Sequence, residues 1–339
     1  MRLTNRDFRL LLELDRNCKT SFSGLSRKVK LSPQLISYKI KAYQDEGVIS
    51  SFTSFMDYAF FGLLHFRVYF KVNYLSKEKF KNLLNFLYDY PGVVGLEECG
   101  GTYDLIAIFA ALNPSEFNKR LKNLIAHHPV QLKNYVILTT IIGYYYPREY
   151  FLEGKDVQSV QLFRDPSGSQ VIIGGDRAFL NLSKKDKMLL SLLQNSARVS
   201  SVQLSRKVHL DPKTIRSRIR LLQERAIIKA FRPVINVQQI GFLVNKILLK
   251  YHNFSVEKEQ ELLTFCKFNP FLVEYIKVLG EWDLELTVET KTREEFQQVC
   301  FSIREKFEDI IADFVSFPLF NTHKKEFIPN HYFTQKKDE

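Results

Sequence analysis

The first 60 residues contain three short segments whose apolar residues recur at helical spacing. The segments begin near residues 5, 22 and 33, and their apolar positions are Phe8, Leu11, Leu12, Leu25, Val29, Ile36, Ile40 and Tyr43. Ser32 precedes Pro33, a pair that is typical of a helix N-cap followed by proline at the first helical position. A helix, a short helix, a tight turn and a capped helix are the helix-turn-helix plan. Val48-Ile49 and Phe52 suit the start of a short wing strand that follows it.

The next 85 residues change to a pattern in which β-rich runs alternate with helical ones. The β-rich runs cover residues 63–72, 93–99, 103–110 and 136–142, and helical spacing covers 76–88 and the region around 117–124. Gly100-Gly101 separates the second and third runs, which favours a strand pair with a tight turn. The order βαββαβ predicts a ferredoxin-like domain.

Both patterns occur a second time after a shift of 179 positions. Residues 3–49 and 182–228 share 17 identities in 47 ungapped positions, where unrelated sequence gives about three. Asp211-Pro212 repeats the helix cap, and the second βαββαβ pattern covers 243–250, 256–267, 272–279, 282–289, 293–306 and 311–319. A period this long exceeds the roughly 20–50 residues of solenoid repeats. The sequence therefore predicts an α+β chain that is a duplicated two-domain unit.

Five segments follow from this duplication. We expect winged helix-turn-helix domains at 1–58 and 180–237, ferredoxin-like domains at 59–150 and 238–330, and a linker at 151–179. The linker holds turn signals at Asp165-Pro-Ser-Gly-Ser169 and Gly174-Gly175. It is either extended, or Val160–Phe163 and Val171–Ile173 pair within it as a small hairpin.

Charge is concentrated in the two helix-turn-helix segments. The 339 residues carry a net charge of +12, but residues 1–60 alone carry +4 and residues 180–239 carry +10. The remaining 219 residues therefore have a net charge of −2. A pair of modules that bind a polyanion explains this distribution better than a generally basic surface does.

The third helix of each copy has an exposed face opposite its apolar residues. Arginine suits guanine edges and phosphates, and Ser or Thr can contact either. Arginine and lysine at the end of the preceding helix suit phosphate contacts that set orientation. The DNA-binding residues that this predicts are Arg27, Lys28, Gln34, Ser37, Tyr38, Lys41, Arg206, Lys207, Lys213, Thr214, Arg216, Ser217, Arg218 and Arg220. Solvated helix faces are the alternative, but two copies behind the same motif favour double-stranded DNA.

The turn Gly101-Thr-Tyr-Asp104 and its counterpart Gly280-Glu-Trp-Asp283 are candidates for a small-molecule site. Glycine permits a close backbone approach, and aspartate can hydrogen-bond an amine or a backbone N–H. We consider Gly101, Thr102, Asp104, Gly280, Glu281 and Asp283 as effector-binding residues. A hairpin whose aspartate satisfies its own turn is the structural alternative.

At this point the chain resembles the Lrp/AsnC (feast/famine) family of prokaryotic transcription regulators. The resemblance rests on Leu-Ser-Arg-Lys-Val-x-Leu-Ser-Pro at 25–33, Leu-Ser-Arg-Lys-Val-x-Leu-Asp-Pro at 204–212, Gly-Val-Ile at 47–49 and the Gly-x-x-Asp turns. It covers about 1–146 and 180–325. It implies ferredoxin-like domains that dimerise through their sheets and bind an amino acid or a similar effector near the Gly-x-x-Asp turn.

Three features depart from the family pattern. Family members usually carry one unit per chain, whereas this chain has two, so one chain would imitate the family dimer as a pseudo-dimer and could assemble further. Lys30 and His209 stand where the turn often has glycine, and a left-handed conformation there costs about 1 kcal/mol. Ala226 replaces the glycine found at Gly47. The two DNA faces also differ, so we expect an asymmetric DNA site.

Other function classes leave little trace in the sequence. The four cysteines lack metal or redox spacing, no membrane-length apolar stretch or signal peptide is present, and the usual hydrolase, P-loop and zinc-protease motifs are absent. We therefore expect a cytoplasmic protein with no metal or cofactor and no enzymatic activity. Two alternatives stay open: an enzyme resembling siroheme decarboxylases, which share this architecture, and a metabolite sensor that has lost DNA binding.

Overall fold

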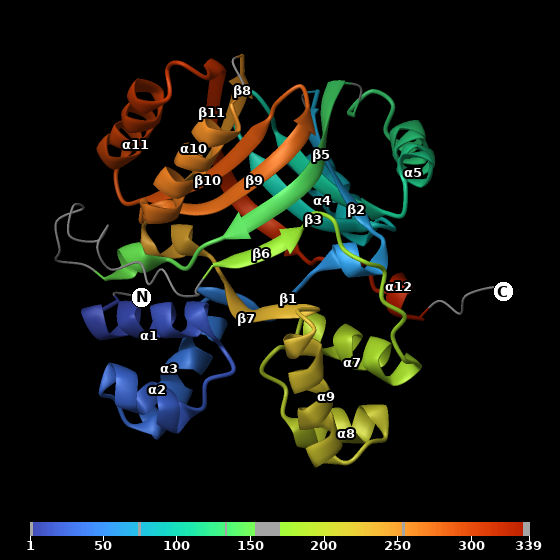
Figure 1. Cartoon of the computed structure of the whole chain (residues 1–339), viewed down its shortest axis with the longest axis vertical. Helices are drawn as coiled ribbons and strands as arrows, with labels where there is room; N and C mark the ends of the chain where they lie inside the picture. Colours follow the sequence, from blue (N-terminus) through green and yellow to red (C-terminus); the bar gives the residue numbers. More distant parts are fainter. Residues whose placement is uncertain (1–2, 74–75, 133, 153–169, 253–254, 335–339) are drawn as a thin grey trace.

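The structure, a computed structural model, describes residues 3–73, 76–132, 134–152, 170–252 and 255–334. Two helical heads lie side by side below a β-barrel that carries helices on its outer surface (Figure 1). Head 1 comprises residues 3–48 and head 2 comprises residues 182–227. The barrel is built from both ferredoxin-like units, so the two copies of the duplicated unit form one body.

Each head contains three helices. Head 1 has α1 (Asn5–Arg16), α2 (Phe22–Val29) and α3 (Pro33–Asp45), and head 2 has α7 (Lys184–Gln194), α8 (Ser201–Val208) and α9 (Pro212–Glu224). The predicted caps are present: the Ser32 side chain accepts a hydrogen bond from the Leu35 amide, and the Asp211 side chain accepts one from the Lys213 amide. Pro33 and Pro212 occupy the first turn of α3 and α9, where a missing N–H has no cost.

Three residues with side chains take the left-handed conformation at turns of the heads. Lys30 and His209, which end α2 and α8, have φ of 56° and 53°. Ala226 has φ of 56° at the position where copy one has Gly47 with φ of 73°. The backbone therefore keeps the geometry that glycine would favour, at a cost of about 1 kcal/mol for each side chain.

The strands that follow the heads pair with each other. β1 (Ile49–Met56) and β7 (Ile228–Ile235) form an antiparallel two-stranded ribbon. The expected wing strands are thus present, and each finds its hydrogen-bond partner in the other copy. A lone strand leaves backbone groups unpaired, and the equivalent strand of the other copy satisfies them.

Contacts between the copies occur in reciprocal pairs. The Cys18 amide donates to the Phe231 carbonyl at 2.8 Å, and the equivalent Ala197 amide donates to the Phe52 carbonyl at 2.8 Å. The Asp57 and Asn236 amides make a second such pair, with the Ile227 and Val48 carbonyls at 3.0 and 2.9 Å. Each pair exchanges under the 179-residue shift, so an approximate twofold axis runs between the heads.

Both ferredoxin-like units follow the predicted order of elements. Unit 1 consists of β2 (Leu64–Lys71), α4 (Lys77–Asp89), β3 (Val93–Cys99), β4 (Leu105–Ala111), α5 (Pro114–His127) and β5 (Asn134–Tyr145). Unit 2 consists of β8 (Leu243–Tyr251), α10 (Val256–Phe268), β9 (Leu272–Gly280), β10 (Leu284–Thr290), α11 (Arg293–Lys306) and β11 (Ile311–Lys325). The strand orders β3-β4-β2-β5 and β9-β10-β8-β11 confirm the split βαβ arrangement.

The two units join into a single sheet that closes on itself. β3 pairs with β11, and β5 pairs with both β9 and β2, so within the described residues eight strands form a continuous ring. Two apolar cores fill the space between the strands and the outer helices, one around Phe66 and Leu87 and one around Ile247 and Leu262. Closure leaves few unpaired strand edges, which removes a site of edge-to-edge association.

The segment between the copies contributes a strand to this sheet. β6 (Val171–Gly174) pairs antiparallel with β5, so the later part of the expected linker is ordered against unit 1. The expected hairpin had Val160–Phe163 as the partner of this strand, but those residues lie outside the described part of the chain. Short 3-10 helices η1 (Tyr58–Phe61), η2 (Glu149–Phe151) and η3 (Val237–Ile240) and the helix α12 (His331–Thr334) complete the described elements.

Candidate nucleic-acid interface

The faces of α3 and α9 are arranged as the apolar spacing predicts. Ile36, Ile40 and Tyr43 of α3 are buried in head 1, and Ile215, Ile219 and Leu222 are their counterparts in α9. Most of the predicted DNA-contacting residues lie exposed on the opposite faces. They are Gln34, Ser37, Tyr38 and Lys41 on α3, and Lys213, Thr214, Arg216, Ser217 and Arg220 on α9.

Arg218 does not lie on this exposed face and corrects the expectation for α9. Its guanidinium donates a hydrogen bond from Nη1 to the Asp186 carboxylate at 2.8 Å, and the side chain is only partly exposed. The equivalent pair in head 1 joins Lys39 to Asp7 at 2.6 Å. Successive helical residues are 100° apart, which turns position 218 onto the flank of α9 that faces α7. Arg218 therefore ties α9 to α7.

The Asp7 carboxylate shows how strong this internal tie is. Burial raises its pKa, but hydrogen bonds from Lys39, Thr4 and Tyr43 outweigh burial and lower the pKa to about 2. Tyr43 Oη donates to Asp7 Oδ1 at 2.6 Å, so the carboxylate links α1 to the C-terminal half of α3. The orientation of α3 in head 1 is fixed by charge as well as by apolar packing.

The other basic residues of α9 make exchangeable surface contacts. Arg216 donates to the Ser201 hydroxyl at 3.1 Å, and Arg220 pairs with Glu224 at 2.8 Å one turn along the helix. Exposed pairs of this kind contribute only about 0.3–0.5 kcal/mol. Both guanidinium groups can therefore leave these partners for a phosphate or a base edge at little cost.

Basic residues also end the helices that precede α3 and α9. Arg27, Lys28, Arg206 and Lys207 are exposed in the last turns of α2 and α8, as expected for phosphate contacts. Lys28 forms an ion pair with Glu13 of α1 at 2.5 Å, with half of its side chain exposed. Arg206 and Lys207 of head 2 thus correspond to Arg27 and Lys28 of head 1. Of the head 1 pair, Lys28 is already bound to a residue of its own head.

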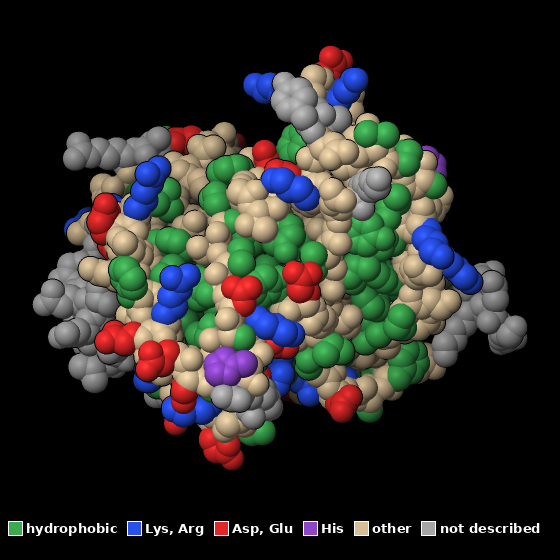
Figure 2. Space-filling model, turned by 90° about the horizontal axis from the view of Figure 1, so that it is seen from above, with side chains coloured by type: hydrophobic (Ala, Val, Ile, Leu, Met, Phe, Trp, Pro, Cys, Tyr) green, Lys and Arg blue, Asp and Glu red, His purple; other side chains and the backbone are tan. Residues whose placement is uncertain are grey.

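Both heads lie on the same side of the barrel, with α3 in one and α9 in the other (Figure 1). The opposite side of the molecule differs in character. Figure 2 shows that acidic and basic side chains are mixed there and that hydrophobic side chains occupy much of the surface. The excess of positive charge in residues 1–60 and 180–239 is therefore located at the end of the molecule that carries the two exposed helix faces.

The two candidate effector turns have closely similar geometry. The Asp104 carboxylate accepts a hydrogen bond from the Val72 amide at 2.8 Å, and Lys71 donates to the Gly101 carbonyl at 2.7 Å. In copy two, Asp283 accepts from the Tyr251 amide at 2.9 Å and Lys250 donates to the Gly280 carbonyl at 3.3 Å. Each aspartate thus closes its own hairpin against the preceding strand. Thr102 and Glu281 are exposed at the turn tips.

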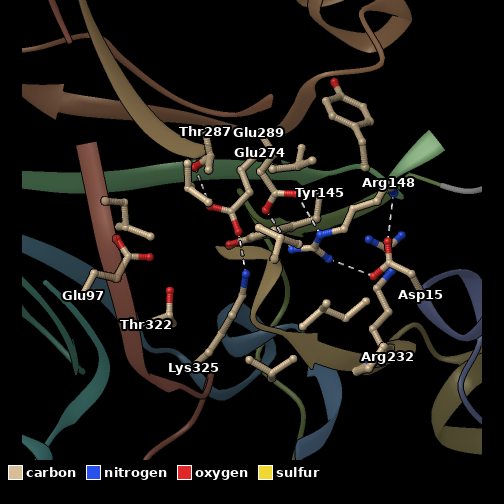
Figure 3. A pocket seen from close by; sticks show the side chains of 18 of the residues that line it. Asp15, Glu97, Tyr145, Arg148, Arg232, Glu274, Thr287, Glu289, Thr322 and Lys325 are labelled. Carbon is tan, nitrogen blue, oxygen red and sulfur yellow. Dashed lines mark hydrogen bonds and ion pairs between the residues drawn. The ribbon is translucent and has the colours of Figure 1, made fainter. Parts of the chain in front are cut away.

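A buried cluster of charged residues, which the sequence patterns did not reveal, lies where the barrel meets the ribbon. It lines a cavity of about 60 Å³, and its charged lining residues are Asp15, Glu97, Arg148, Arg232, Lys246, Glu274, Glu289 and Lys325. Figure 3 shows Arg148 between Asp15 and Glu289, and Lys325 directed at Glu274. Four acidic and four basic side chains balance one another in this lining.

Ion pairs connect this cluster to the inside of the barrel. Lys246 is fully buried and lies 2.7 Å from Glu285 and 3.2 Å from Glu97, and Arg67 lies 2.7 Å from Glu285. Burial raises the pKa of Glu285, but the charges of Arg67 and Lys246 outweigh it, so the pKa is lowered. The carboxylate therefore stays ionised, and removing one partner would leave an uncompensated buried charge.

The polar residues that β10 of copy two contributes to this cluster are not repeated in copy one. Glu285, Thr287 and Glu289 alternate along β10, whereas the equivalent positions of β4 hold Ile106, Ile108 and Ala110. Alternation of polar and apolar residues normally predicts that the polar face of a strand meets water. Here the barrel closes over that face. In the sequence, only the equivalent strand β4, which is nearly apolar, indicated that this face is buried.

Other kinds of site receive no support in the part of the chain that the structure describes. No three His, Cys, Asp or Glu side chains gather there as a metal site would require, and all four cysteines are free thiols. None of the described helices is long and apolar enough to cross a membrane.

These features define a class: a two-headed helix-turn-helix protein with exposed basic and polar helices. The AsnC-type helix-turn-helix domain matches residues 182–223, and a winged helix-turn-helix DNA-binding domain matches residues 3–50. The transcriptional regulator FL11 of Pyrococcus horikoshii is 30% identical over 115 residues, which are 34% of this chain and 74% of that protein. The regulator Ptr1 of Methanocaldococcus jannaschii is 32% identical over 102 residues, 30% of this chain and 68% of that protein.

The chain belongs to the Lrp/AsnC family of helix-turn-helix transcription regulators. Among solved structures, the siroheme decarboxylase NirDL is similar over 98% of this chain and 97% of its own, with a TM-score of 0.60 and 14% sequence identity. At that identity the similarity concerns the fold: NirDL and this chain share the whole two-unit arrangement.

Proposed function

We propose that this protein is a sequence-specific regulator of transcription that binds double-stranded DNA, with one chain acting as a pseudo-dimer. The observation that carries the proposal is the pair of exposed, donor-rich helices α3 and α9 on one side of the molecule. The reciprocal contacts between the copies fix the two heads relative to each other, as a dimer interface would. A regulator of this kind works beside the chromosome, so the proposal places it in the cytoplasm of a prokaryote.

The geometry predicts a bipartite DNA site. Two helix-turn-helix heads related by a twofold axis contact half-sites that are separated by one helical turn, roughly 10 bp, or by a multiple of it. The approximate axis relates backbones, but the side chains differ: Ser37 and Tyr38 of α3 correspond to Arg216 and Ser217 of α9. The two half-sites should therefore differ in sequence, with the higher affinity at the half-site bound by head 2.

Selection of bound sequences from a random pool of DNA duplexes tests this proposal directly. We expect enrichment of a site with two unlike half-sites, and footprinting should show one chain covering both. Failure to enrich any sequence at low salt would overturn the proposal. Enrichment of a perfect palindrome covered by a single chain would contradict the assignment of unlike heads.

We also propose that a small molecule such as an amino acid modulates binding at the turns around Gly101 and Gly280. Support comes from the exposed tips Thr102 and Glu281 beside an ordered Lys–Asp pair in each copy. The selection repeated with and without the twenty amino acids measures this. A DNA affinity that no amino acid changes would contradict an effector of this class.

A second candidate function, siroheme decarboxylation, is favoured only by the full-length similarity of fold to NirDL. The cavity where the barrel meets the ribbon has a volume of about 60 Å³. Pockets that bury drug-sized ligands measure about 300–1,000 Å³, and a tetrapyrrole is larger than most such ligands. We therefore propose DNA binding, and not this decarboxylation, as the function of the chain. An absorption spectrum recorded after adding siroheme to the protein distinguishes the two functions, because a bound tetrapyrrole changes its absorption bands.

A further inference from the structure

A cleft of about 530 Å³ runs along one flank of α3 and is formed by both heads. Ser37, Lys41 and Gln44, at helical spacing on α3, form one wall. The other wall comes from head 2, where Ser196, Arg198 and Gln203 belong to the loop before α8 and to α8 itself. Ser37 and Lys41 are predicted DNA-contacting residues, so the cleft adjoins the face of α3 that would enter the major groove.

The chemistry of the cleft suits a polyanion. None of the described residues that line it is acidic, two are cationic, and seven are neutral polar residues. Of these seven, Asn195 already donates to Glu326 and Ser50 to the Val234 carbonyl, which leaves five with donors for a ligand. Phosphate oxygens accept hydrogen bonds from arginine, lysine, serine, asparagine and glutamine side chains, and such contacts set the register of a protein on DNA. A wall of donors without carboxylates is therefore complementary to the sugar-phosphate backbone.

Arg198 is held in the cleft by contacts to head 1. Its guanidinium donates to the Cys18 carbonyl and lies 5.0 Å from the ring centre of Phe22 and 5.5 Å from that of Phe52. Its twofold counterpart, Lys19, makes the matching contact to the Ala197 carbonyl at 2.9 Å. Because Arg198 is already anchored across the axis, little side-chain entropy is lost when a phosphate binds it.

The flank of α9 that corresponds to this cleft is occupied differently. Arg216 stands where α3 has Ser37, and it reaches the hydroxyl of Ser201, which stands where head 1 has Phe22. Head 2 thus carries its own cation on the flank of its third helix. Head 1 has Ser37 and no cation at that position, and its flank, which carries Lys41, borders a cleft into which head 2 extends Arg198.

We propose that this cleft holds the DNA backbone beside the half-site bound by α3, with Ser196, Arg198 and Gln203 of head 2 as phosphate contacts. The inference rests on the proposed DNA-binding function and adds residues outside both third helices to the interface. Head 2 would then contribute to the affinity of both half-sites, which compensates for the less basic face of α3.

Gln203→Glu provides a test that leaves the fold intact. The Gln203 side chain accepts hydrogen bonds from the Ser200 amide and hydroxyl at 3.1 Å in a capping box, and glutamate serves that box equally well. The substitution therefore keeps α8 but places a negative charge in the cleft. We expect DNA affinity to fall about tenfold at low salt and the loss to shrink as salt rises. Gln203→Lys should increase affinity.

Gln297→Glu is the matched control, because it changes the net charge equally at an exposed position of α11, far from the heads (Figure 1). Binding is measured by titration of a fluorescent duplex selected with the unaltered protein. If Gln203→Glu and Gln297→Glu bind equally while Arg216→Ala binds more weakly, the cleft proposal is wrong and the DNA-binding function stands. If the unaltered protein selects no DNA, both proposals fail.

Discussion

Ala226 shows how a single side chain carries a measurable conformational cost. It has φ of 56° at the junction of head 2 with β7, where Gly47 fills the equivalent place in copy one. Ala226→Gly should raise the free energy of unfolding by about 0.5–1 kcal/mol, because relief of the left-handed strain exceeds the entropy added to the unfolded chain. Gly47→Ala, the reciprocal change, should lower it by a similar amount. Chemical denaturation measures both, and a loss of stability in Ala226→Gly would contradict this account.

From the buried side chain of His65 we predict how the free energy of unfolding depends on pH. The ring is buried, stacks on Tyr58 and donates from Nε2 to the Phe327 carbonyl at 2.9 Å, and burial lowers its pKa to about 3. Below pH 6.5 the unfolded state binds a proton that the folded state does not, so stability falls as pH decreases from about 6.5 to about 3. The slope from this one group is about 1.4 kcal/mol per pH unit.

His65→Gln keeps a donor at this position but cannot titrate. Denaturation curves between pH 7 and pH 4 should show that the variant loses less stability on acidification than the unaltered protein, by about 1.4 kcal/mol per pH unit. Parallel curves for the two proteins would show that His65 does not control the acid response. The carboxylates that titrate in this range are common to both proteins and cancel in the comparison.

At the scale of the element, α9 carries two arginines one half-turn apart with different roles. Arg216 is exposed, whereas Arg218 is tied to Asp186 of α7. Arg216→Ala should weaken specific DNA binding by about 1–3 kcal/mol per lost base contact. Arg218→Ala should change DNA affinity little but lower the free energy of unfolding by about 1 kcal/mol, because Asp186 loses its partner. Gel shifts and denaturation of both variants measure these effects, and the reverse pattern would exchange the roles.

The elements themselves were largely predictable, and their partners were not. Apolar spacing located α1, α3 and their copies, and the Ser-Pro and Asp-Pro pairs located the starts of α3 and α9, because these signals arise from neighbouring residues. The expected wing strands exist as β1 and β7, but they pair across the copies. Strand pairing depends on which surfaces meet in space, and local sequence does not encode that.

The candidate site was predicted in part for the same reason. Exposure of residues 34, 37, 38 and 41 followed from helical periodicity once the buried face was known. Arg218 was misplaced because its position on the helix is intermediate and a salt bridge to α7 decides its direction. The wall that Arg198 adds to the cleft beside α3 comes from residues more than 150 positions away, and no spacing rule connects them.

At the scale of the whole molecule, the third helices of the two heads have equivalent positions but different exposed side chains. The asymmetry of the DNA site can therefore be tested. Exchanging the α9 face for that of α3, with Lys213→Gln, Arg216→Ser, Ser217→Tyr and Arg220→Lys, should convert the preferred site toward two like half-sites and reduce affinity. Selection from random DNA measures the change. An unchanged asymmetric site after the exchange would show that α3 and α9 do not determine the sequence preference.

The sequence by itself determined the duplication, the order of elements in each unit, the helix caps and the confinement of positive charge to the heads. Those properties follow from composition and from short-range spacing. Only the tertiary structure decided that β1 and β7 form a shared ribbon, that the two sheets close into a barrel, and that Glu285 and Glu289 point inward among cations. Each of these depends on contacts between the copies, where hydrogen-bond pairing and charge neutralisation are satisfied only when distant segments meet.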